Sequence, residues 1–545
     1  MAVSVASLKK PILRHGLMLL TFGVVTAGRT LSMTVSTVFL KKFFRFTRIC
    51  FNNLRISKMI VTVQRKKCMS RTIFLSMFLL AAICTVAHGT GLTPRAKKLL
   101  HGRTVQADFG FDMYKDRSAR SIAEEIAANG YEGVYYFVIS DSAVRKDIIS
   151  ELQKRGIPVA ALVIASGAYL PVDERPQDWG KYLMQFTNNR MDDYKFLSFV
   201  HKGYAIWMKH RIVKLINQNG FDGFTFAEVM YPITDGLERK DVLYGDVSPA
   251  FQAAFKKATG DTVFPEFVNE VKWNYYKKIP KVYNDLVEFR VKTINDFYDE
   301  VVNGKDGVRE KCPGMFVATW TMGISTPNGV EKLREWEGQD IPAMIKRVKP
   351  DMHFIQTHWP DWSNHDLKGD YPLLYKPFFD VIKATDPTLP IGFQADMVSE
   401  ADARRAPDWQ NLFYKTCERM KLDCTTYYVF SLRWAVYNQP PQLRGVKLVW
   451  KDVVELCFDK RISKDCSEIV LGRKMIAADN GKSYTVKSAE VDGNLLKIVL
   501  DGDLSGINEV TVNVGGIKDD PAYRVAPKGD VNIIPAETVT KIPLQ

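Results

Sequence analysis

Short apolar and β-branched runs alternate with longer segments of helical periodicity between residues 104 and 435. Helix-ending signals rich in Gly, Asn and Pro stand before several of these runs, so each run predicts a buried strand that follows a helix. The eight predicted strands cover residues 104–112, 133–139, 158–165, 223–229, 314–320, 351–357, 390–396 and 425–431. Strands that alternate with helices are typical of βα units around a parallel sheet.

Eight such units predict an α/β fold of the (β/α)8 type, the TIM barrel, with helical insertions. A doubly wound open sheet is the alternative. Two connections are long: residues 166–222 include an aromatic-rich stretch before a helix that ends near Asn219, and the next connection has amphipathic patterns at 265–279 and 283–302. Long insertions at barrel strand ends usually build the walls of a site.

A different texture begins at Ser483, where polar and apolar residues alternate with period two around Asp-Gly and Gly-Gly turns. This pattern predicts a small, sandwich-like all-β domain. The expected division is a leader at 1–89, a barrel at 90–445 and a β-rich domain at 446–545. Because Tyr484 and Tyr523 are the only aromatic residues after residue 470, we expect this domain to cap the barrel rather than to bind glycan.

The charge of the chain is concentrated in the leader. The 545 residues include 75 Lys or Arg and 61 Asp or Glu, a formal net charge of +14. Residues 1–89 contain 14 of the basic residues and no acidic one, so the rest of the chain is formally neutral. A nucleic-acid partner is therefore not expected.

The leader has the order of a secretory signal peptide. Basic residues at 65–67 and 71 precede the apolar run 73–86, and Ala87-His88-Gly89 follows as a small-x-small cleavage site. We expect cleavage after Gly89 and a periplasmic or extracellular protein. An uncleaved membrane anchor is the alternative. Residues 1–58 fit no domain pattern, and a start at Met59 or Met69 would give an ordinary signal peptide.

Five cysteines follow the leader, namely Cys312, Cys417, Cys424, Cys457 and Cys466. Export permits disulfides, and the second and third or the fourth and fifth of them are close enough in sequence to pair, although an odd number leaves one thiol over. No spacing is a zinc signature. His353 and His358 lie five apart on a strand and would point to opposite faces, so a metal site is not expected. No cofactor is expected either.

Acids and aromatic residues collect where the predicted strands end, which is where barrel enzymes hold their sites. Carboxylates surrounded by Trp and Tyr suit a sugar, which offers hydroxyls to acids and amides and a C–H face to rings. The predicted substrate-binding residues are Asp112, Tyr136, Tyr231, Trp320, His358, Trp359, Gln394, Arg433 and Trp434. Motifs of serine hydrolases, nucleotide-binding loops, dinucleotide enzymes and zincins are absent from the sequence.

Two carboxyl groups are the predicted catalysts. Glu228 is the candidate general acid/base, because apolar neighbours would raise its pKa and keep a proton on it near neutral pH. Those neighbours are Phe224, Phe226, Val229 and Met230. Asp396, which closes the seventh predicted strand, is the candidate nucleophile or base, with Asp112 as a substitute for it or as a ligand of a sugar hydroxyl.

The stretch DGFTFAEVMYP at residues 222–232 resembles the fourth-strand segment of bacterial glycoside-hydrolase-like TIM-barrel proteins. It is also similar to the wider retaining clan, which implies an acid/base glutamate after strand four and a nucleophile after strand seven. The match departs from both patterns at Ala227, where the first group has an acid and the clan usually has Asn. The seventh strand ends in Asp396 instead of the clan's usual glutamate.

Together these features predict a secreted glycoside hydrolase that cleaves a poly- or oligosaccharide with two carboxyl groups. We expect retention of anomeric configuration, for which the two carboxyls would lie about 5 to 5.5 Å apart, whereas about 6.5 to 9.5 Å would indicate inversion. The alternative, motivated by Ala227, is a non-catalytic carbohydrate-binding or cell-envelope protein on the same scaffold.

Overall fold

A computed structural model describes residues 91–165, 169–188, 195–232, 243–396, 405–428, 439–520 and 531–545, without the side chain of Asp396, and four short strands nearer the N-terminus. These strands are β1 (Ile12–Arg14), β2 (Leu17–Leu19), β3 (Gly23–Thr26) and β4 (Arg29–Ser32), paired β1 with β2 and β3 with β4. Residues 1–89 and 90–545 form two separate compact units. The predicted apolar run and cleavage site of the leader lie outside the described residues.

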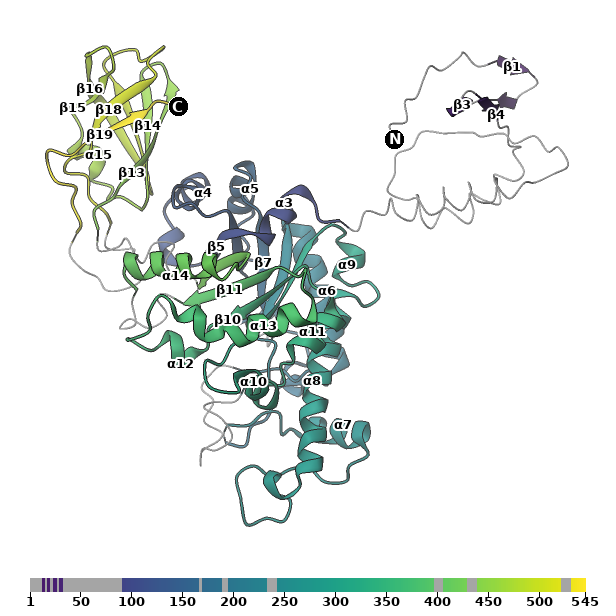
Figure 1. Cartoon of the computed structure of the whole chain (residues 1–545). Helices are drawn as coiled ribbons and strands as arrows, with labels where there is room; N and C mark the ends of the chain where they lie inside the picture. The colour runs from purple at the N-terminus through teal and green to yellow at the C-terminus, as the bar shows by residue number, and fades with distance from the viewer. Residues whose placement is uncertain are drawn as a thin grey trace. The chain divides into compact units, whose positions relative to one another are not determined.

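Eight parallel strands close into a barrel in chain order, which confirms the predicted (β/α)8 fold and excludes the open sheet (Figure 1). The strands are β5 (Gly102–Ala107), β6 (Gly133–Phe137), β7 (Val159–Ile164), β8 (Gly223–Ala227), β9 (Phe316–Met322), β10 (Met352–Gln356), β11 (Ile391–Asp396) and β12 (Cys424–Tyr428). Closure pairs β12 with β5 through Cys424 and Gly102. All eight predicted strands are present.

Helices connect the strands and surround the barrel. The α-helices of this part are α3 (Pro94–Lys97), α4 (Ala119–Ala128), α5 (Lys146–Lys154), α6 (Lys202–Asn219), α7 (Pro249–Thr259), α8 (Pro280–Val302), α9 (Val308–Lys311), α10 (Gly329–Glu337), α11 (Ile341–Val348), α12 (Trp359–Trp362), α13 (Lys376–Thr385) and α14 (Pro407–Arg419). Short 3-10 turns are η1 (Lys98–Leu100), η2 (Asp112–Tyr114), η3 (Val172–Glu174), η4 (Trp179–Tyr182), η5 (Tyr276–Lys278) and η6 (Tyr371–Tyr375).

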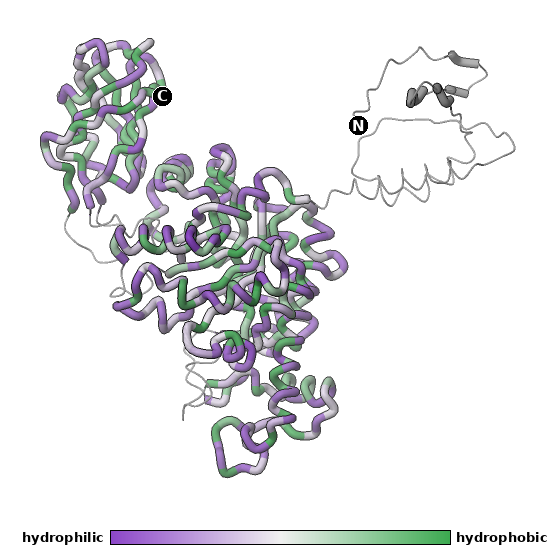
Figure 2. Tube along the Cα trace, in the orientation of Figure 1, coloured by the Kyte–Doolittle hydropathy of each residue, from purple (hydrophilic) through white to green (hydrophobic). Residues whose placement is uncertain are grey.

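The barrel strands are apolar on both faces, because one face fills the barrel and the other meets the helices. Figure 2 colours the chain by the hydropathy of each residue, with apolar residues in green. On β6, Tyr135 and Phe137 belong to the cluster inside the barrel. Their neighbours Val134 and Tyr136 belong to the larger cluster shared with the helices. Alternation with period two therefore decides which strand residues can face the barrel interior.

The two amphipathic patterns in the long connection after β8 fold differently. Residues 283–302 lie within α8, as their periodicity indicates. Residues 265–279 form no α-helix and only the turn η5. The Glu266 carboxylate accepts the backbone N–H groups of Phe267 and Val268, so local side-chain bonds replace helical ones.

The C-terminal part is a seven-stranded antiparallel sheet with its own apolar core, as predicted. Its strands are β13 (Leu443–Trp450), β14 (Val453–Phe458), β15 (Lys474–Ala478), β16 (Ser483–Asp492), β17 (Leu495–Leu500), β18 (Glu509–Asn513) and β19 (Val539–Pro543), with the single-turn helix α15 (Cys466–Ile469). The Gln545 N–H donates to Val446 O and Leu448 N–H donates to Gln545 O, so the chain end pairs with β13.

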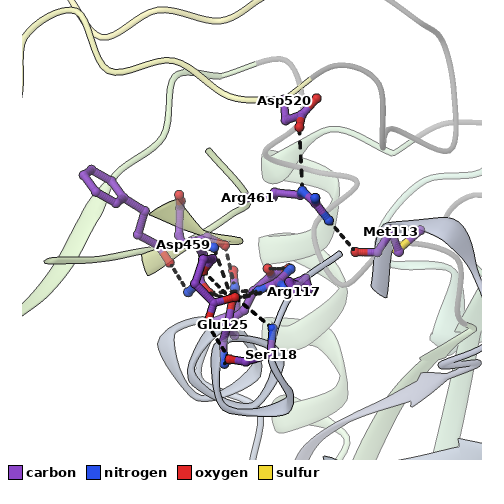
Figure 3. Close-up of polar contacts among 12 residues, drawn as sticks. Met113, Arg117, Ser118, Glu125, Asp459, Arg461 and Asp520 are labelled. Atoms are coloured by element: carbon purple, nitrogen blue, oxygen red, sulfur yellow. Dashed lines mark hydrogen bonds and ion pairs between the residues drawn. The ribbon is translucent and has the colours of Figure 1, made fainter. Parts of the chain in front are cut away.

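The β16–β17 turn contacts the start of α4 through hydrogen bonds, and Figure 3 shows the polar contacts around Arg117, Ser118 and Glu125 in this region. The Arg117 guanidinium donates to Glu125 within the barrel and to Asn494 Oδ1 of the turn at 2.9 Å. Ser121 Oγ donates to the Asp492 carbonyl at 2.8 Å. A second contact joins Arg461 to the Lys115 carbonyl at 2.8 Å.

The cysteine pairings suggested by the sequence are wrong. All five cysteines of the described part are free thiols. Cys417 lies in α14 and Cys424 in β12, and burial raises the pKa of each thiol. In the part of the chain that the structure describes, none of the helices combines the length and the apolar character that a bilayer crossing requires.

Candidate active site

Glu228 is the first residue after β8, at the end of the barrel where the strands finish. Its φ of 57° lies in the left-handed region, which is unusual for a residue with a side chain and breaks the alternation of the strand. The expected apolar partners Phe224 and Phe226 face outward. The Phe226 ring contacts Phe297 and Tyr298 of α8, with ring centroids 5.4 and 5.3 Å apart, so it stabilises the helix layer.

A second carboxyl group, Glu337, interacts electrostatically with Glu228. Glu337 is the last residue of α10, in the segment that follows β9, and its side chain is only 5% exposed. Two hydrogen bonds align its segment with that of Glu228: Tyr231 N–H donates to the Glu337 carbonyl at 3.0 Å, and Gln339 Nε2 donates to Val229 O at 3.0 Å. The end of β8 and the end of α10 therefore bring two carboxyls together.

Burial controls the protonation of Glu337. Removal from water raises the pKa of its carboxyl, the positive charge of Arg290 lowers it, and the negative charge of Glu228 raises it further, to about 8. Glu337 Oε2 is buried and has no hydrogen-bond partner among the described residues. At neutral pH the carboxyl is therefore protonated and uncharged.

Arg290 of α8 is the cation that lowers the pKa of Glu337, but its donors are directed elsewhere. It is fully buried and donates to the carbonyls of Glu335 and Trp336 at 3.1 and 2.7 Å, and to Tyr244 Oη at 2.9 Å. These carbonyls lie at the C-terminal end of α10, where a positive charge is favourable. Arg290 thus fixes the helix end that carries Glu337.

His358 contributes an imidazole from the end of β10. Its Nε2 lies 4.0 Å from Glu337 Oε1, and its side chain is 14% exposed. The Tyr375 hydroxyl accepts the His358 backbone N–H at 3.1 Å, which fixes the residue at the start of α12. The next residue, Trp359, is 43% exposed, and both were predicted at this strand end.

Tyr231, a predicted substrate-binding residue, is buried beneath the site and holds the segment that carries Glu337. It is fully buried, its hydroxyl lies 2.6 Å from Thr293 Oγ1, and the Arg290 guanidinium lies 4.8 Å from its ring centre. Burial raises the pKa of its phenol. Tyr231 therefore positions the Glu337 segment and is not accessible to a substrate.

Two predicted substrate contacts lie in the core instead. Tyr136 faces the helix layer, where its hydroxyl accepts the Arg145 backbone N–H at 3.0 Å and burial raises its pKa to about 12. Tyr135 and Phe137 take the interior positions of that strand. Trp320 is inside the barrel but 2% exposed, with its ring stacked on Phe354 at 4.3 Å. Tyr136 is not a substrate contact because strand alternation turns it to the outer face, and Trp320 is not one because it is buried too deeply in the barrel.

The remaining predicted residues are placed as follows. Gln394 lies in β11, is 3% exposed, and its Oε1 accepts the Thr357 N–H at 3.3 Å. Asp112 is not at a strand end, because β5 finishes at Ala107, and its side chain is 82% exposed beside Lys115. Asp396 is the last residue of β11, paired with Tyr428, but its side chain lies outside the described residues, as do Arg433 and Trp434.

Glu337 is not among the residues predicted from the sequence, although α10 carries a signal for it. Gly329, Leu333 and Glu337 are four residues apart and form the buried face of the helix. A carboxylate on an apolar face, next to the C-terminal glycine of a helix, opposes both burial and the helix dipole. Such a position is unfavourable for stability alone and indicates a special environment.

Metal binding finds no support among the described residues, because no group of three or more His, Cys, Asp or Glu side chains is placed to hold an ion. His353 faces the outer layer, with its ring nitrogens 2.8 and 3.1 Å from the hydroxyls of Thr319 and Thr321. Burial lowers its pKa to about 3, so the ring is neutral and structural.

No protein-family model matches the chain, and no curated protein matches it in sequence. Solved structures with a similar arrangement include the glycoside hydrolase domain of PelA from Pseudomonas aeruginosa, at 8% identity over 62% of this chain and 96% of that chain, with a TM-score of 0.33. A hyperthermostable endo-1,4-beta-D-mannanase from Thermotoga petrophila RKU-1 is 11% identical over 60% of this chain and 88% of that chain, with a TM-score of 0.36.

The catalytic domain of a hyperthermophilic chitinase from Pyrococcus furiosus is 10% identical over 61% of this chain and 84% of that chain, with a TM-score of 0.32. All three neighbours are glycoside hydrolases, and the closed parallel barrel of this chain is consistent with the resemblance seen in its sequence. At TM-scores below 0.5, these likenesses bear on neither its substrate nor its reaction. The function is therefore inferred from the residues of the site.

Proposed function

We propose that the chain is a glycoside hydrolase in which Glu228 is a catalytic carboxyl. The observation that supports this most directly is the pair formed by Glu228, just after β8 of the closed barrel, and Glu337, at the end of α10, in which Glu337 keeps a proton at neutral pH. Glycosidic cleavage needs a carboxylic acid to protonate the leaving oxygen and a carboxylate on the other side of the bond.

In this proposal Glu228 acts as general acid and then general base, and Asp396 acts as the second carboxylate. Its support is the position of Asp396 as the last residue of β11, three strands along the barrel from β8. The substrate is a poly- or oligosaccharide, and the exposed Trp359 near His358 offers a ring face for a sugar. Retention of anomeric configuration is the expected outcome.

The experiment is a screen of the purified chain against polysaccharides and aryl glycosides, followed by NMR of the anomeric configuration of the first product. Glu228→Gln should lower turnover about 10²- to 10⁴-fold while sugar binding is retained. Glu331→Gln is the matched control, because Glu331 is an exposed residue of α10. Unchanged turnover in Glu228→Gln would refute the assignment.

A second candidate function is carbohydrate binding without catalysis. Ala227 supports it, because this residue faces the barrel interior at the end of β8, where the resembled family has an acid. Binding to a glycan panel without release of reducing ends, equal in the wild type and in Glu228→Gln, would favour this function.

Export through the leader is part of the proposal and rests on the order of its basic and apolar residues. Expression of the full chain, separation of the cell fractions and N-terminal sequencing test it. A mature protein that begins at Thr90 is expected outside the cytoplasm, and an intact leader on a cytoplasmic protein would contradict export.

A further inference from the structure

We propose that Glu337 is a positioning residue of this site: a buried second carboxyl that shares one proton with Glu228 and thereby sets the pH range in which Glu228 can act as an acid. The inference rests on the proposed function of Glu228 and adds a residue that does not touch the reacting atoms. It explains why a carboxyl stands on the apolar face of α10.

The first support is that hydrogen bonds hold the segment of Glu337 against the segment of Glu228. Besides the two bonds between their segments, Gln339 Oε1 accepts the Met322 N–H at 2.8 Å, so one amide side chain, two residues after α10, joins this segment to the ends of β8 and β9. Gly338 ends α10 at φ 69°, and a Cβ there would lie 3.1 Å from both Arg290 Cβ and Tyr231 Cδ2. Glu337 therefore has little freedom to move away from Glu228.

The second support is the set of charged and titratable groups around Glu337. Arg290 faces it from α8, Glu228 from the end of β8 and His358 from the end of β10. Arg290 directs its hydrogen bonds to backbone carbonyls and to a phenol, while Glu337 Oε2 is buried without a partner in the described part of the chain. A charged carboxylate in that position would be poorly compensated.

The chemical consequence follows from like-charge repulsion. Two close carboxyls in a poorly hydrated place do not both ionise readily, so they release their last proton at a higher pH than either would alone. That proton resides mainly on Glu337, and the tautomer that carries it on Glu228 is the one that protonates the glycosidic oxygen. Glu228 then recovers it from the water that completes hydrolysis, so the pair ends with the proton it began with.

The kinetic test uses Glu337→Gln, with Glu331→Gln as control, and the aryl glycoside that the wild type cleaves fastest. In the Gln variant only one carboxylate can form, so Glu228 loses its proton without a like charge nearby. The alkaline limb of kcat/KM should move to lower pH by at least one unit, while kcat on the acidic side stays within about threefold. If the alkaline limb of kcat/KM does not move in Glu337→Gln while Glu228→Gln is inactive, the role of Glu337 is overturned and the proposed function of Glu228 stands.

A second measurement requires no substrate. The pH dependence of thermal stability reports the ionisation of Glu337, and Glu228→Gln removes the charge that favours its proton. The midpoint of that dependence should move to lower pH in Glu228→Gln and should be absent in Glu337→Gln. An identical midpoint in the wild type and in Glu228→Gln would show that the two carboxyls are independent. Full activity of Glu228→Gln would refute the proposed function instead.

Discussion

At the scale of single residues, Glu337 combines two effects that act in the same direction. Burial and the charge of Glu228 both favour the protonated carboxyl, and together they outweigh the positive charge of Arg290. The ordinary value of a glutamate is 4.5, so the folded chain holds a proton that the unfolded chain releases over most of the neutral range. Such a difference links stability to pH.

We predict that this carboxyl makes the barrel less stable as pH rises. Its contribution is fully present below about pH 4.5 and is lost as pH rises to about 8, since over that range the native state binds more protons than the unfolded state. The slope for one group is up to about 1.4 kcal/mol per pH unit. Denaturant unfolding from pH 5 to 8 should show this slope in the wild type and in Glu331→Gln, and a flatter one in Glu337→Gln.

At the scale of elements, the end of α10 depends on Gly338. Its left-handed φ of 69° permits the helix to stop, and the missing side chain permits Arg290 and Tyr231 to pack against it. Gly260 ends α7 in a similar conformation, with φ 80°, but a Cβ there would meet nothing within 4 Å. A substitution at Gly260 therefore tests backbone strain alone, whereas one at Gly338 tests strain and crowding together.

We predict that Gly260→Ala destabilises the chain by about 1 kcal/mol, the usual cost of the left-handed conformation for alanine. Gly338→Ala should lose more, because the added methyl also displaces the neighbours of Glu337. Chemical denaturation measures both variants. Equal losses would show that the space around Gly338 adjusts without cost and that crowding there does not hold Glu337 in place.

At the scale of the whole chain from residue 90 onward, Arg117 links the barrel to the β domain. It forms a buried ion pair within the barrel domain and also donates a hydrogen bond to the β domain. The side chains of Arg117 and Glu125, both labelled in Figure 3, are 2% and 3% exposed. Arg117 donates to Asn494 in the β16–β17 turn. Gly493 in that turn has φ 60°, and a Cβ there would lie 2.3 Å from Ser121 Oγ. The contact therefore needs glycine at this position.

We predict that Arg117→Met weakens this interface strongly, because it leaves the buried Glu125 carboxylate without its cation, at a cost of about 3 to 5 kcal/mol. Calorimetry should show a lower or divided transition, and limited proteolysis should separate the barrel from the β domain faster. Arg419→Met is the control, since Arg419 is exposed and donates to Lys415 O and Thr416 Oγ1 of its own helix. A single, unshifted transition in Arg117→Met would contradict this role.

The hydrophobic pattern was sufficient to predict the eight barrel strands and the antiparallel C-terminal domain, because period and turn chemistry are local properties. The same pattern placed Glu228 at a strand end. It was misleading where a residue's depth or face mattered: Tyr136 is on the outer face, Trp320 is too deep in the barrel, and the first predicted strand stops before Asp112.

The sequence by itself determined the class of fold and the position of one carboxyl, since alternation and helix-ending signals are written in neighbouring residues. Only the tertiary structure decided which carboxyl stands beside Glu228. Glu337 follows it by more than a hundred residues and reaches it through hydrogen bonds between the ends of β8 and the segment after α10. Barrel closure creates that proximity, and burial there keeps the proton on Glu337, which no local pattern records.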